Sequence, residues 1–261
     1  MKIARLLLII APLLLLSCEK EEKDFDALIR GTWINTEIDG TPVLTNETFV
    51  LSFRSDGTEF YAKGFNIDEN NRSWIENSNY TYSVRGNTLV IEGTDVDNHL
   101  YQMEFLIESL SSTSLTYTVK TFSVDQTDYP DTKKYTCRKA AANYSNAFAG
   151  VWYGRCTTEG TADTQYHYWE YFPDGSFHYY YQNENLEWVK KSDNDGGYFL
   201  YGNLFASNYS NDLLLGGTGK AFECWNFSIS GNQMTWTGLR EDNHTVTYQM
   251  ERVESAPETS L

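Results

Sequence analysis

Two stretches of this chain share one pattern that decides its fold: FVLSFRSDGTEFYAK at residues 49–63 and YHYWEYFPDGSFHYYYQ at residues 166–182. Each consists of a run of strand-forming residues, an Asp-Gly pair and a second such run. Asp-Gly between two such runs is typical of a tight hairpin, because glycine tolerates the positive φ that these turns require. The sequence therefore predicts the same β-hairpin twice.

The similarity extends outward from the two hairpins in a conserved order. Gly31-Thr32-Trp33 matches Gly150-Val151-Trp152, and Trp74 matches Trp188. YSVRGNTLVI from Tyr82 matches YFLYGNLFAS from Tyr198, and IESLSSTSLTYT from Ile107 matches FSISGNQMTWT from Phe227. We interpret this as a tandem duplication with domains at residues 25–140 and 146–254, a linker from Lys139 and a polar tail from Glu254. One large sheet domain of the full length is the alternative.

The periodicity within each copy is that of β-strands. Apolar Tyr101, Met103 and Phe105 alternate with polar residues, as do Val246 and Tyr248. This alternation indicates antiparallel strands with one face on a core. Only 25–30 and 145–149 suggest a helical turn. Each copy contains eight or nine predicted short strands. An up-and-down sheet of that many strands loses its exposed edges when it closes into a barrel. We therefore predict an all-β chain of two tandem antiparallel up-and-down barrels.

The amino-terminal segment has the features of a secretion signal. Lys2 and Arg5 precede an apolar run that is too short to span a bilayer, so residues 1–17 are expected to be removed. Leu15-Leu16-Ser17-Cys18 resembles the bacterial lipobox, which implies acylation of Cys18 and a membrane anchor. An ordinary signal in which Cys18 merely lies near the cleavage site is the alternative. Residues 18–24 then form an acidic tether.

Charge and the residues after Cys18 bear on location and partners. Glu19-Lys20-Glu21-Glu22 resembles the export signal of Bacteroidetes surface lipoproteins, which favours outer-membrane anchoring with surface display over periplasmic retention. Loss of Lys2 and Arg5 changes the formal charge from −16 to −18. A chain this acidic without a basic patch is a poor nucleic-acid binder.

The repeated Gly-x-Trp and the meander that follows it resemble the lipocalin-like domains of Bacteroidetes lipoproteins. The resemblance covers both copies, although they are short and lack a second lipocalin signature. It implies that Trp33 and Trp152 plug one barrel end and that the other end opens toward a ligand. We expect these tryptophans to be structural rather than ligand contacts.

Signals for catalysis or cofactor binding are weak. The four histidines have no metal-ligand spacing, and SDNDGG from Ser192 lacks the glutamate that would close a calcium loop. His178 and Glu170 on the two arms of the second hairpin could form an acid/base pair, but an exposed ion pair explains them equally well. We find no hydrolase, phosphate-binding or dinucleotide motif. We therefore predict a non-enzyme without metal or cofactor.

Three cysteines remain after lipidation of Cys18. Cys156 with Cys224 would close a loop inside the second copy, and this is the preferred candidate disulfide. Cys137 with Cys156 would staple the two copies, and three buried free thiols are the third alternative.

Aromatic residues are the compositional excess, and the second hairpin carries them on both faces. We take Trp169, Tyr171, Tyr179, Tyr180 and Tyr181 as candidate ligand-binding residues. An outward aromatic face can mark a binding surface, but tyrosine is also simply a good strand residue. Two function classes follow: a barrel that binds a small apolar or mixed ligand, which we favour, and a glycan- or protein-binding surface module. A register shift of one residue exchanges the two faces, so the sequence leaves open which aromatics point inward.

Overall fold

The computed structural model describes residues 24–54, 59–67, 72–95, 97–140, 143–191, 196–210, 220–240 and 242–259. The predicted signal peptide, Cys18 and the acidic residues after it lie outside this range. So do the Asp56-Gly57 turn and most of the SDNDGG segment.

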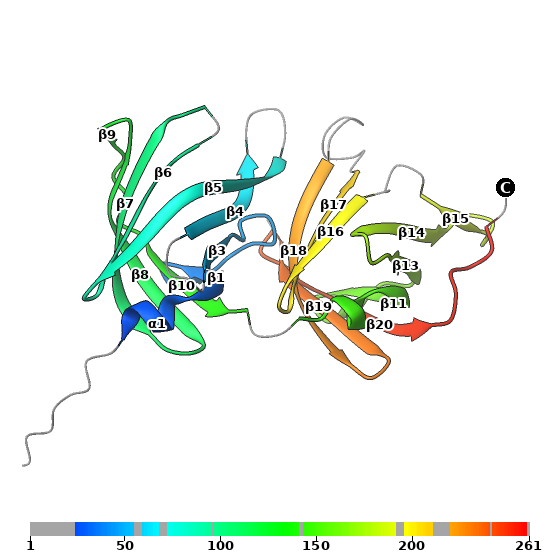
Figure 1. The fold of residues 1–261 in the computed structure, drawn as a ribbon. Helices are drawn as coiled ribbons and strands as arrows, with labels where there is room; N and C mark the ends of the chain where they lie inside the picture. The colour runs from blue at the N-terminus through cyan, green and yellow to red at the C-terminus, as the bar shows by residue number, and fades with distance from the viewer. Residues whose placement is uncertain are drawn as a thin grey trace, which may run out of the picture.

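The first half of the chain forms barrel 1, a closed antiparallel barrel of eight strands (Figure 1). Its order is β10-β1-β3-β4-β5-β6-β7-β8, and β8 closes the ring by pairing with β10. The two-residue strands β2 and β9 extend β1 and β8. The elements are α1 (Phe25–Ile29), β1 (Gly31–Ile38), β2 (Thr41–Pro42), β3 (Val50–Phe53), β4 (Glu59–Ile67), β5 (Arg72–Arg85), β6 (Thr88–Thr94), β7 (Leu100–Leu110), β8 (Ser114–Val124), β9 (Thr127–Asp128) and β10 (Lys134–Lys139).

The second half forms barrel 2, which is also a closed antiparallel barrel of eight strands. Its order is β11-β13-β14-β16-β17-β18-β19-β20, and β20 pairs back with β11. The short strands β12 and β15 flank it. The elements are α2 (Ser145–Phe148), β11 (Gly150–Thr158), β12 (Thr161–Ala162), β13 (His167–Tyr171), β14 (Ser176–Gln182), β15 (Trp188–Lys190), β16 (Gly196–Tyr201), β17 (Leu204–Ser210), β18 (Lys220–Ser230), β19 (Gln233–Leu239) and β20 (Thr245–Val253).

The predicted fold class is confirmed: the described chain is all-β, with two closed antiparallel barrels in tandem. The quoted hairpins are β3–β4 and β13–β14, and each pairs in antiparallel register. Three further turns carry Gly86, Gly202 and Gly231 at φ between 55° and 59°, a region that glycine enters without steric cost. Turn chemistry and alternation thus agree with the observed strand order.

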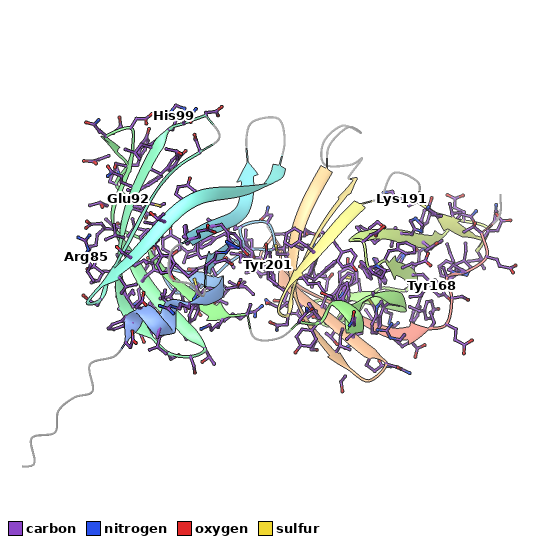
Figure 2. The ribbon with its side chains drawn as sticks, viewed as in Figure 1. Arg85, Glu92, His99, Tyr168, Lys191 and Tyr201 are labelled. Atoms are coloured by element: carbon purple, nitrogen blue, oxygen red, sulfur yellow. The ribbon has the colours of Figure 1, made fainter. Side chains whose placement is uncertain are left out.

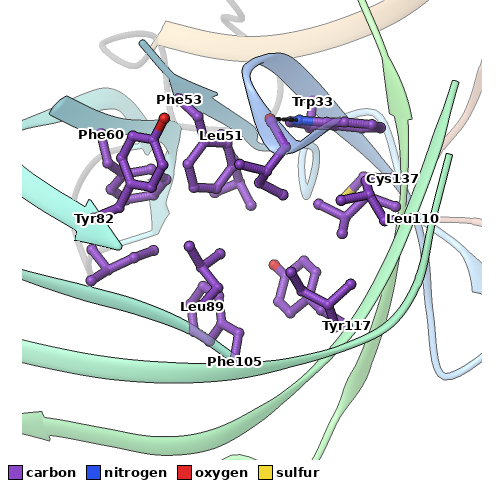
Figure 3. Close-up of a cluster of buried hydrophobic side chains, with 14 of the residues drawn as sticks. Trp33, Leu51, Phe53, Phe60, Tyr82, Leu89, Phe105, Leu110, Tyr117 and Cys137 are labelled. Atoms are coloured by element: carbon purple, nitrogen blue, oxygen red, sulfur yellow. Dashed lines mark hydrogen bonds between the residues drawn. The ribbon is translucent and has the colours of Figure 1, made fainter. Parts of the chain in front are cut away.

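A short helix and a buried tryptophan stand at the start of each barrel. The indole Nε1 of Trp33 donates to the carbonyl of Ile29 at 2.6 Å, and Trp152 donates to Phe148 at 2.8 Å. Both tryptophans are fully buried. Lys139 and Arg252 lie over their rings at 5.0 and 4.2 Å, so each end also has a cation–π contact (Figure 3 shows Trp33).

The two barrels have cores of different composition. Barrel 1 mixes rings with aliphatic side chains such as Leu51, Leu89 and Leu110 (Figure 3). The buried cluster of barrel 2 consists almost entirely of aromatic rings, with Met234, Val246 and Met250 as its aliphatic members. This difference concentrates large flat side chains inside barrel 2.

The outer walls of the two barrels pack on each other. Ile34 and Val50 of barrel 1 form one buried cluster with Leu204, Ala206 and Cys224 of barrel 2. Beside it, the Arg138 guanidinium donates to the side-chain oxygens of two asparagines of barrel 2, Asn226 at 2.8 Å and Asn203. The apolar patch and the satisfied guanidinium together dock the barrels along β1, β3 and β10 on one side and β17 and β18 on the other.

Candidate ligand-binding cavity in the second barrel

The closed ring of barrel 2 settles which hairpin face points inward. His167, Trp169 and Tyr171 of β13 face the barrel interior together with Phe177 and Tyr179 of β14. In the register, Trp169 pairs with Tyr179 and Tyr171 with Phe177. The residues that alternate with them, Tyr168 with Tyr180 and Glu170 with His178, pair on the outer face. Figure 2 labels Tyr168, one of these outer-face residues, among the side chains of barrel 2.

The inward side chains line a cavity of about 550 Å³, within the size range of small-molecule sites. Its apolar wall is made of eight aromatic residues: Trp169, Tyr171, Phe177, Tyr179, Phe205, Trp225, Trp236 and Tyr248. Its polar lining comes from Cys156, Thr158, Asp163, Gln165, His167, Lys191, Ser207, Glu223 and Arg240. Among the described residues, no Leu, Ile, Val or Met side chain lines it.

Three of the five predicted binding residues belong to this cavity, namely Trp169, Tyr171 and Tyr179. Tyr181 is half-buried and stacks on Tyr179 at 6.3 Å without lining the cavity. Tyr180 lies on the outer face, where its hydroxyl donates to Glu170 at 2.9 Å. Their role in binding stays a prediction, and only Tyr180 is turned away from the cavity by the strand register.

The sequence analysis did not single out the opposite wall of the cavity. Trp225, Trp236 and Tyr248 come from β18, β19 and β20, and each pair of these rings lies between 5.3 and 6.4 Å apart. Trp169 meets Trp236 and Tyr248 in T-shaped contacts at 5.5 and 5.6 Å. Edge-to-face pairs of this kind stabilise a rigid wall. The alternation of Met234 and Trp236 with polar residues on β19 was the available signal for it.

One polar atom in this wall is unsatisfied. The indole Nε1 of Trp236 is buried, and no described residue offers it an acceptor. Trp236 itself is 4% exposed and is ringed by Phe205, Trp169 and Tyr248. A buried donor without a partner is costly, so such a group needs an explanation.

His167 is held neutral at the cavity wall. Its Nδ1 and the Tyr179 hydroxyl are joined by a hydrogen bond of 2.8 Å. Burial lowers the pKa of His167 below 6.5, and the nearby Asp163 only partly opposes this. Charging the ring would place a cation among aromatic side chains with little access to water.

This pKa shift predicts a pH effect on stability. Because the unfolded chain binds a proton on His167 more readily, stability is fully present above about pH 6.5 and falls as the pH drops through the lower folded-state pKa. We expect His167→Gln to reduce the loss in free energy of unfolding between pH 7.5 and 5.5, measured by urea denaturation.

His99 provides the matched control with the opposite sign. Its hydrogen bond to Asp125, at 2.6 Å, raises the pKa of His99, so its contribution is present below about pH 6.5 and is lost as the pH rises. His99→Gln should therefore steepen the decline toward pH 5.5. Identical pH profiles for the wild type and His167→Gln would contradict the assignment.

A loop of barrel 1 enters the wall of barrel 2 beside the cavity. The ladder between β18 and β19 ends at Asn226 and Thr237, and Thr45 occupies the next position between the two strands. The Thr45 amide donates to the carbonyl of Leu239, and its carbonyl accepts from the amide of Cys224, both at 2.7 Å. Thr45 thus replaces the pairing that Cys224 and Leu239 would otherwise make.

The inserted loop contacts polar residues of the cavity. The Thr45 hydroxyl lies 3.4 Å from a carboxylate oxygen of Glu223. Glu223 also pairs with Arg240 at 3.1 Å, and the Arg240 guanidinium lies 5.3 Å over the ring of Trp225. Barrel 1 therefore helps to position one side of the cavity in barrel 2.

The three cysteines described by the structure are free thiols, which differs from the candidate Cys156–Cys224 disulfide. Cys156 lines the cavity, whereas Cys224 is buried at the contact with barrel 1. The two side chains lie on opposite faces of the barrel wall, which is why they do not meet. Cys137 is buried in the core of barrel 1, where burial raises its pKa to about 12.

The predicted acid/base candidates are indeed cross-strand neighbours, with His178 Nδ1 at 3.3 Å from Glu170 Oε2. They lie on the outer face of β13 and β14, away from the cavity. Over the described part of the chain, no group of three or more His, Cys, Asp and Glu side chains is placed to hold a metal ion.

A second aromatic group covers the outside of barrel 2. Tyr153 stacks on Tyr166 at 5.0 Å and contacts Tyr168 at 4.5 Å, and Trp188 meets Tyr168 edge-on at 4.8 Å. Arg155 lies 5.1 Å over the ring of Tyr166. All four rings are half-buried, so this outer patch keeps aromatic surface in contact with solvent.

No family model and no curated protein matches the chain. Among solved structures, it is similar to the isotype 1 transferrin binding protein B from serogroup B Neisseria meningitidis. The two chains are 10% identical, the match covers 82% of this chain and 67% of that chain, and the TM-score is 0.23. At this TM-score the likeness carries no argument about fold or function.

Proposed function

We propose that this protein is a non-catalytic, membrane-anchored binding lipoprotein that holds a small apolar or mixed ligand in barrel 2. The observation that carries the proposal is the cavity of about 550 Å³, with its wall of eight aromatic residues and its polar lining. Concave, mostly apolar sites with a few placed polar groups are typical of small-molecule binding. Barrel 1 supports this site through the inserted Thr45.

The arrangement of titratable groups supports binding rather than catalysis. His167 is tied to a tyrosine hydroxyl and is held neutral by burial. Glu223 is engaged by Arg240, and His178 with Glu170 lies outside the cavity. Covalent catalysis needs a nucleophile beside an oriented base. The Tyr179 hydroxyl and His167 are such neighbours, but no described carboxylate is hydrogen-bonded to the imidazole to orient it as a base.

The membrane anchor is proposed from the sequence around Cys18. None of the described helices has the length and apolar character needed to cross a bilayer. Cys18 lies six residues before Asp24, which caps α1. Because an extended chain spans at most about 3.5 Å per residue, acyl chains on Cys18 would hold barrel 1 within roughly 20 Å of the outer membrane surface. The acidic residues after Cys18 favour display on the cell surface.

Replacement of Cys18 tests the anchor directly. We expect Cys18→Ala to abolish incorporation of an alkyne-labelled fatty acid and to move the protein from the membrane fraction to the soluble fraction, because no acyl chain can then be attached. Cys156→Ala is the matched control and should leave both readouts unchanged. Persistent labelling or membrane retention of Cys18→Ala would contradict the proposal.

Native mass spectrometry tests the binding function. The fragment from Lys23 to Leu261 contains every described strand of both barrels and would be released from the host envelope for the measurement. We expect a reproducible small-molecule adduct that slows alkylation of Cys156, the thiol that lines the cavity. A bare mass together with unchanged Cys156 alkylation would contradict ligand binding in barrel 2.

The outer patch supports a second candidate function. Its half-buried rings on β11, β13 and β15 offer a surface for a glycan or protein partner (residues Tyr153, Tyr166, Tyr168 and Trp188). Aromatic side chains are frequent contact residues at such surfaces. Tyr168→Ala should weaken binding on a glycan array under this alternative, and Trp169→Ala should do so only if the cavity is the binding site.

A further inference from the structure

The cavity of barrel 2 is aromatic at one end and polar at the other. Tyr171 and Phe205 contact Phe148 of α2 at 4.8 and 4.9 Å, so an aromatic floor lies toward the plugged end of the barrel. Polar lining residues follow on the same strands, with Ser207 two positions after Phe205 and His167 four positions before Tyr171. Even spacing keeps them on the same inward face. A bound molecule would therefore meet rings at its deep end and polar groups at this polar rim.

Ser207 is the rim residue whose hydroxyl is available to a ligand. The residue lines the cavity and is only 9% exposed, and no described residue forms a hydrogen bond with its side chain. The described side-chain atoms that are both unpartnered and closed off belong to other residues, the Trp236 indole among them. The Ser207 oxygen therefore keeps surface that a molecule in the cavity can contact, and it can both donate and accept a hydrogen bond.

The acceptor beside Ser207 is already engaged by other donors. Ser207 pairs with Glu223 across β17 and β18, and both residues line the cavity. The Arg240 guanidinium pairs with this carboxylate, with Nε 3.1 Å from Oε1 and Nη2 3.2 Å from Oε2. The Thr45 hydroxyl lies 3.4 Å from the same Oε1. A nearly buried hydroxyl without a protein partner favours a ligand that supplies one.

The charges at the rim do not select an ion. Glu223 is paired with Arg240, and His167 is neutral because burial lowers its pKa. The remaining charged residues, Lys191 and Asp163, are opposite in sign. An uncharged polar group is therefore compatible with the whole rim.

The floor of the cavity discriminates between apolar ligands. Every described apolar side chain that lines the cavity is an aromatic ring. Barrel 1, by contrast, packs aliphatic side chains such as Leu89, Ile91 and Leu115 among its rings. Rings prefer offset-stacked or edge-to-face partners, so an all-aromatic floor favours a planar ring over a saturated one.

We infer that barrel 2 binds an uncharged planar aromatic molecule with a hydrogen-bonding substituent, the ring lying on the aromatic floor and the substituent pairing with the Ser207 hydroxyl. This inference rests on the proposed function and specifies the class and orientation of its ligand. The rings supply affinity, and Ser207 supplies selectivity for the substituent. Saturated molecules and unsubstituted aromatic hydrocarbons are the disfavoured classes.

Three matched probes test the two requirements separately. 2-Naphthol and naphthalene share a planar bicyclic body, but only 2-naphthol carries a hydroxyl group, whereas decahydro-2-naphthol keeps the skeleton and hydroxyl without the flat ring. In equilibrium dialysis of the Lys23–Leu261 fragment, we expect 2-naphthol to bind about tenfold more tightly than naphthalene, because a hydrogen bond to a buried polar group is worth roughly that factor. It should bind roughly threefold more tightly than decahydro-2-naphthol.

Two serine variants locate the effect. Ser207→Ala removes the hydroxyl and should bring the affinity for 2-naphthol down to that for naphthalene, while naphthalene binding stays unchanged. This variant loses no described hydrogen bond, and circular dichroism checks that it folds. Ser228→Ala on β18 is the matched control, because Ser228 is exposed, and it should leave both affinities unchanged. The wild-type ratio of the probes tests the inference even if Ser207→Ala does not fold.

The outcomes separate this inference from the proposed function. Equal wild-type affinities for 2-naphthol and naphthalene, an unchanged ratio in Ser207→Ala, or equal binding of decahydro-2-naphthol would each overturn the inference alone. So would failure of every probe to bind a protein that carries an adduct in native mass spectrometry. Failure of every probe together with a bare native mass and unchanged Cys156 alkylation would overturn the proposed function itself.

Discussion

Trp152→Ala is expected to destabilise barrel 2 by about 3–5 kcal/mol, the range for removing a large buried aromatic side chain. Trp152 is completely buried. Its indole donates to the Phe148 carbonyl, and Arg252 lies 4.2 Å over its ring. Alanine would leave a cavity at the barrel end and an unpaired carbonyl of α2. Urea denaturation followed by circular dichroism measures the loss.

The repeated architecture supplies controls for this experiment. Trp33→Ala should destabilise barrel 1 by a similar amount, since Trp33 is equally buried and donates to Ile29. Trp188→Ala changes a half-buried ring on the outer patch and should cost no more than about 1 kcal/mol. Hydrogen exchange should place the effect of Trp152→Ala in barrel 2. A loss as small as that of Trp188→Ala would show that Trp152 is not a structural plug.

Gly238→Ala is expected to expel Thr45 from the wall of barrel 2 and to loosen the contact between the barrels. A Cβ atom at residue 238 would lie 2.4 Å from Thr45 Cγ2 and 2.8 Å from a ring carbon of Trp225. Overpacking of this kind costs about 1–3 kcal/mol, and here the inserted loop is the part that can move. Small-angle scattering should show a larger radius of gyration, and hydrogen exchange should show faster exchange at the Cys224 amide.

Ligand binding should respond to the same substitution, because Trp225, Glu223 and Arg240 all contribute to the cavity. Thr45→Ser removes the clashing methyl group and keeps the backbone hydrogen bonds, so the Gly238→Ala/Thr45→Ser double variant should recover part of the docking and part of the affinity. Such non-additivity is expected for residues in direct contact. An unchanged scattering profile and unchanged exchange at Cys224 in Gly238→Ala would contradict the coupling of the barrels.

Local sequence features predicted the strands of this fold well. The alternation around Met103 and Tyr248 and the glycine turns at 86, 202 and 231 match the observed hairpins. Short helices at α1 and α2 lie where the two helical turns were expected. These features depend on contacts between near neighbours in the chain, which propensity and turn chemistry describe directly.

The candidate site could be predicted only in part. Trp169, Tyr171 and Tyr179 were recognised because the hairpin concentrates aromatics, but Tyr180 belongs to the outer face. Trp225, Trp236 and Tyr248 are separated from that hairpin by more than forty residues, so no local pattern connects them. The sequence also did not predict that Cys156 and Cys224 lie on opposite faces of the barrel wall.

The sequence by itself determined that the chain forms antiparallel strands, that the pattern occurs twice, and that each copy starts with Gly-x-Trp. It determined these features because period-2 alternation, turn residues and internal repetition are properties of short segments. Only the tertiary structure decided which aromatic face of β13 and β14 points inward, which remote rings complete the cavity, and that Thr45 enters the neighbouring wall. The physical reason is that alternation defines two faces but does not distinguish them. Closure of the ring between β11 and β20 determines which face of the hairpin points inward. Docking of the two barrels places Thr45 in the wall of barrel 2.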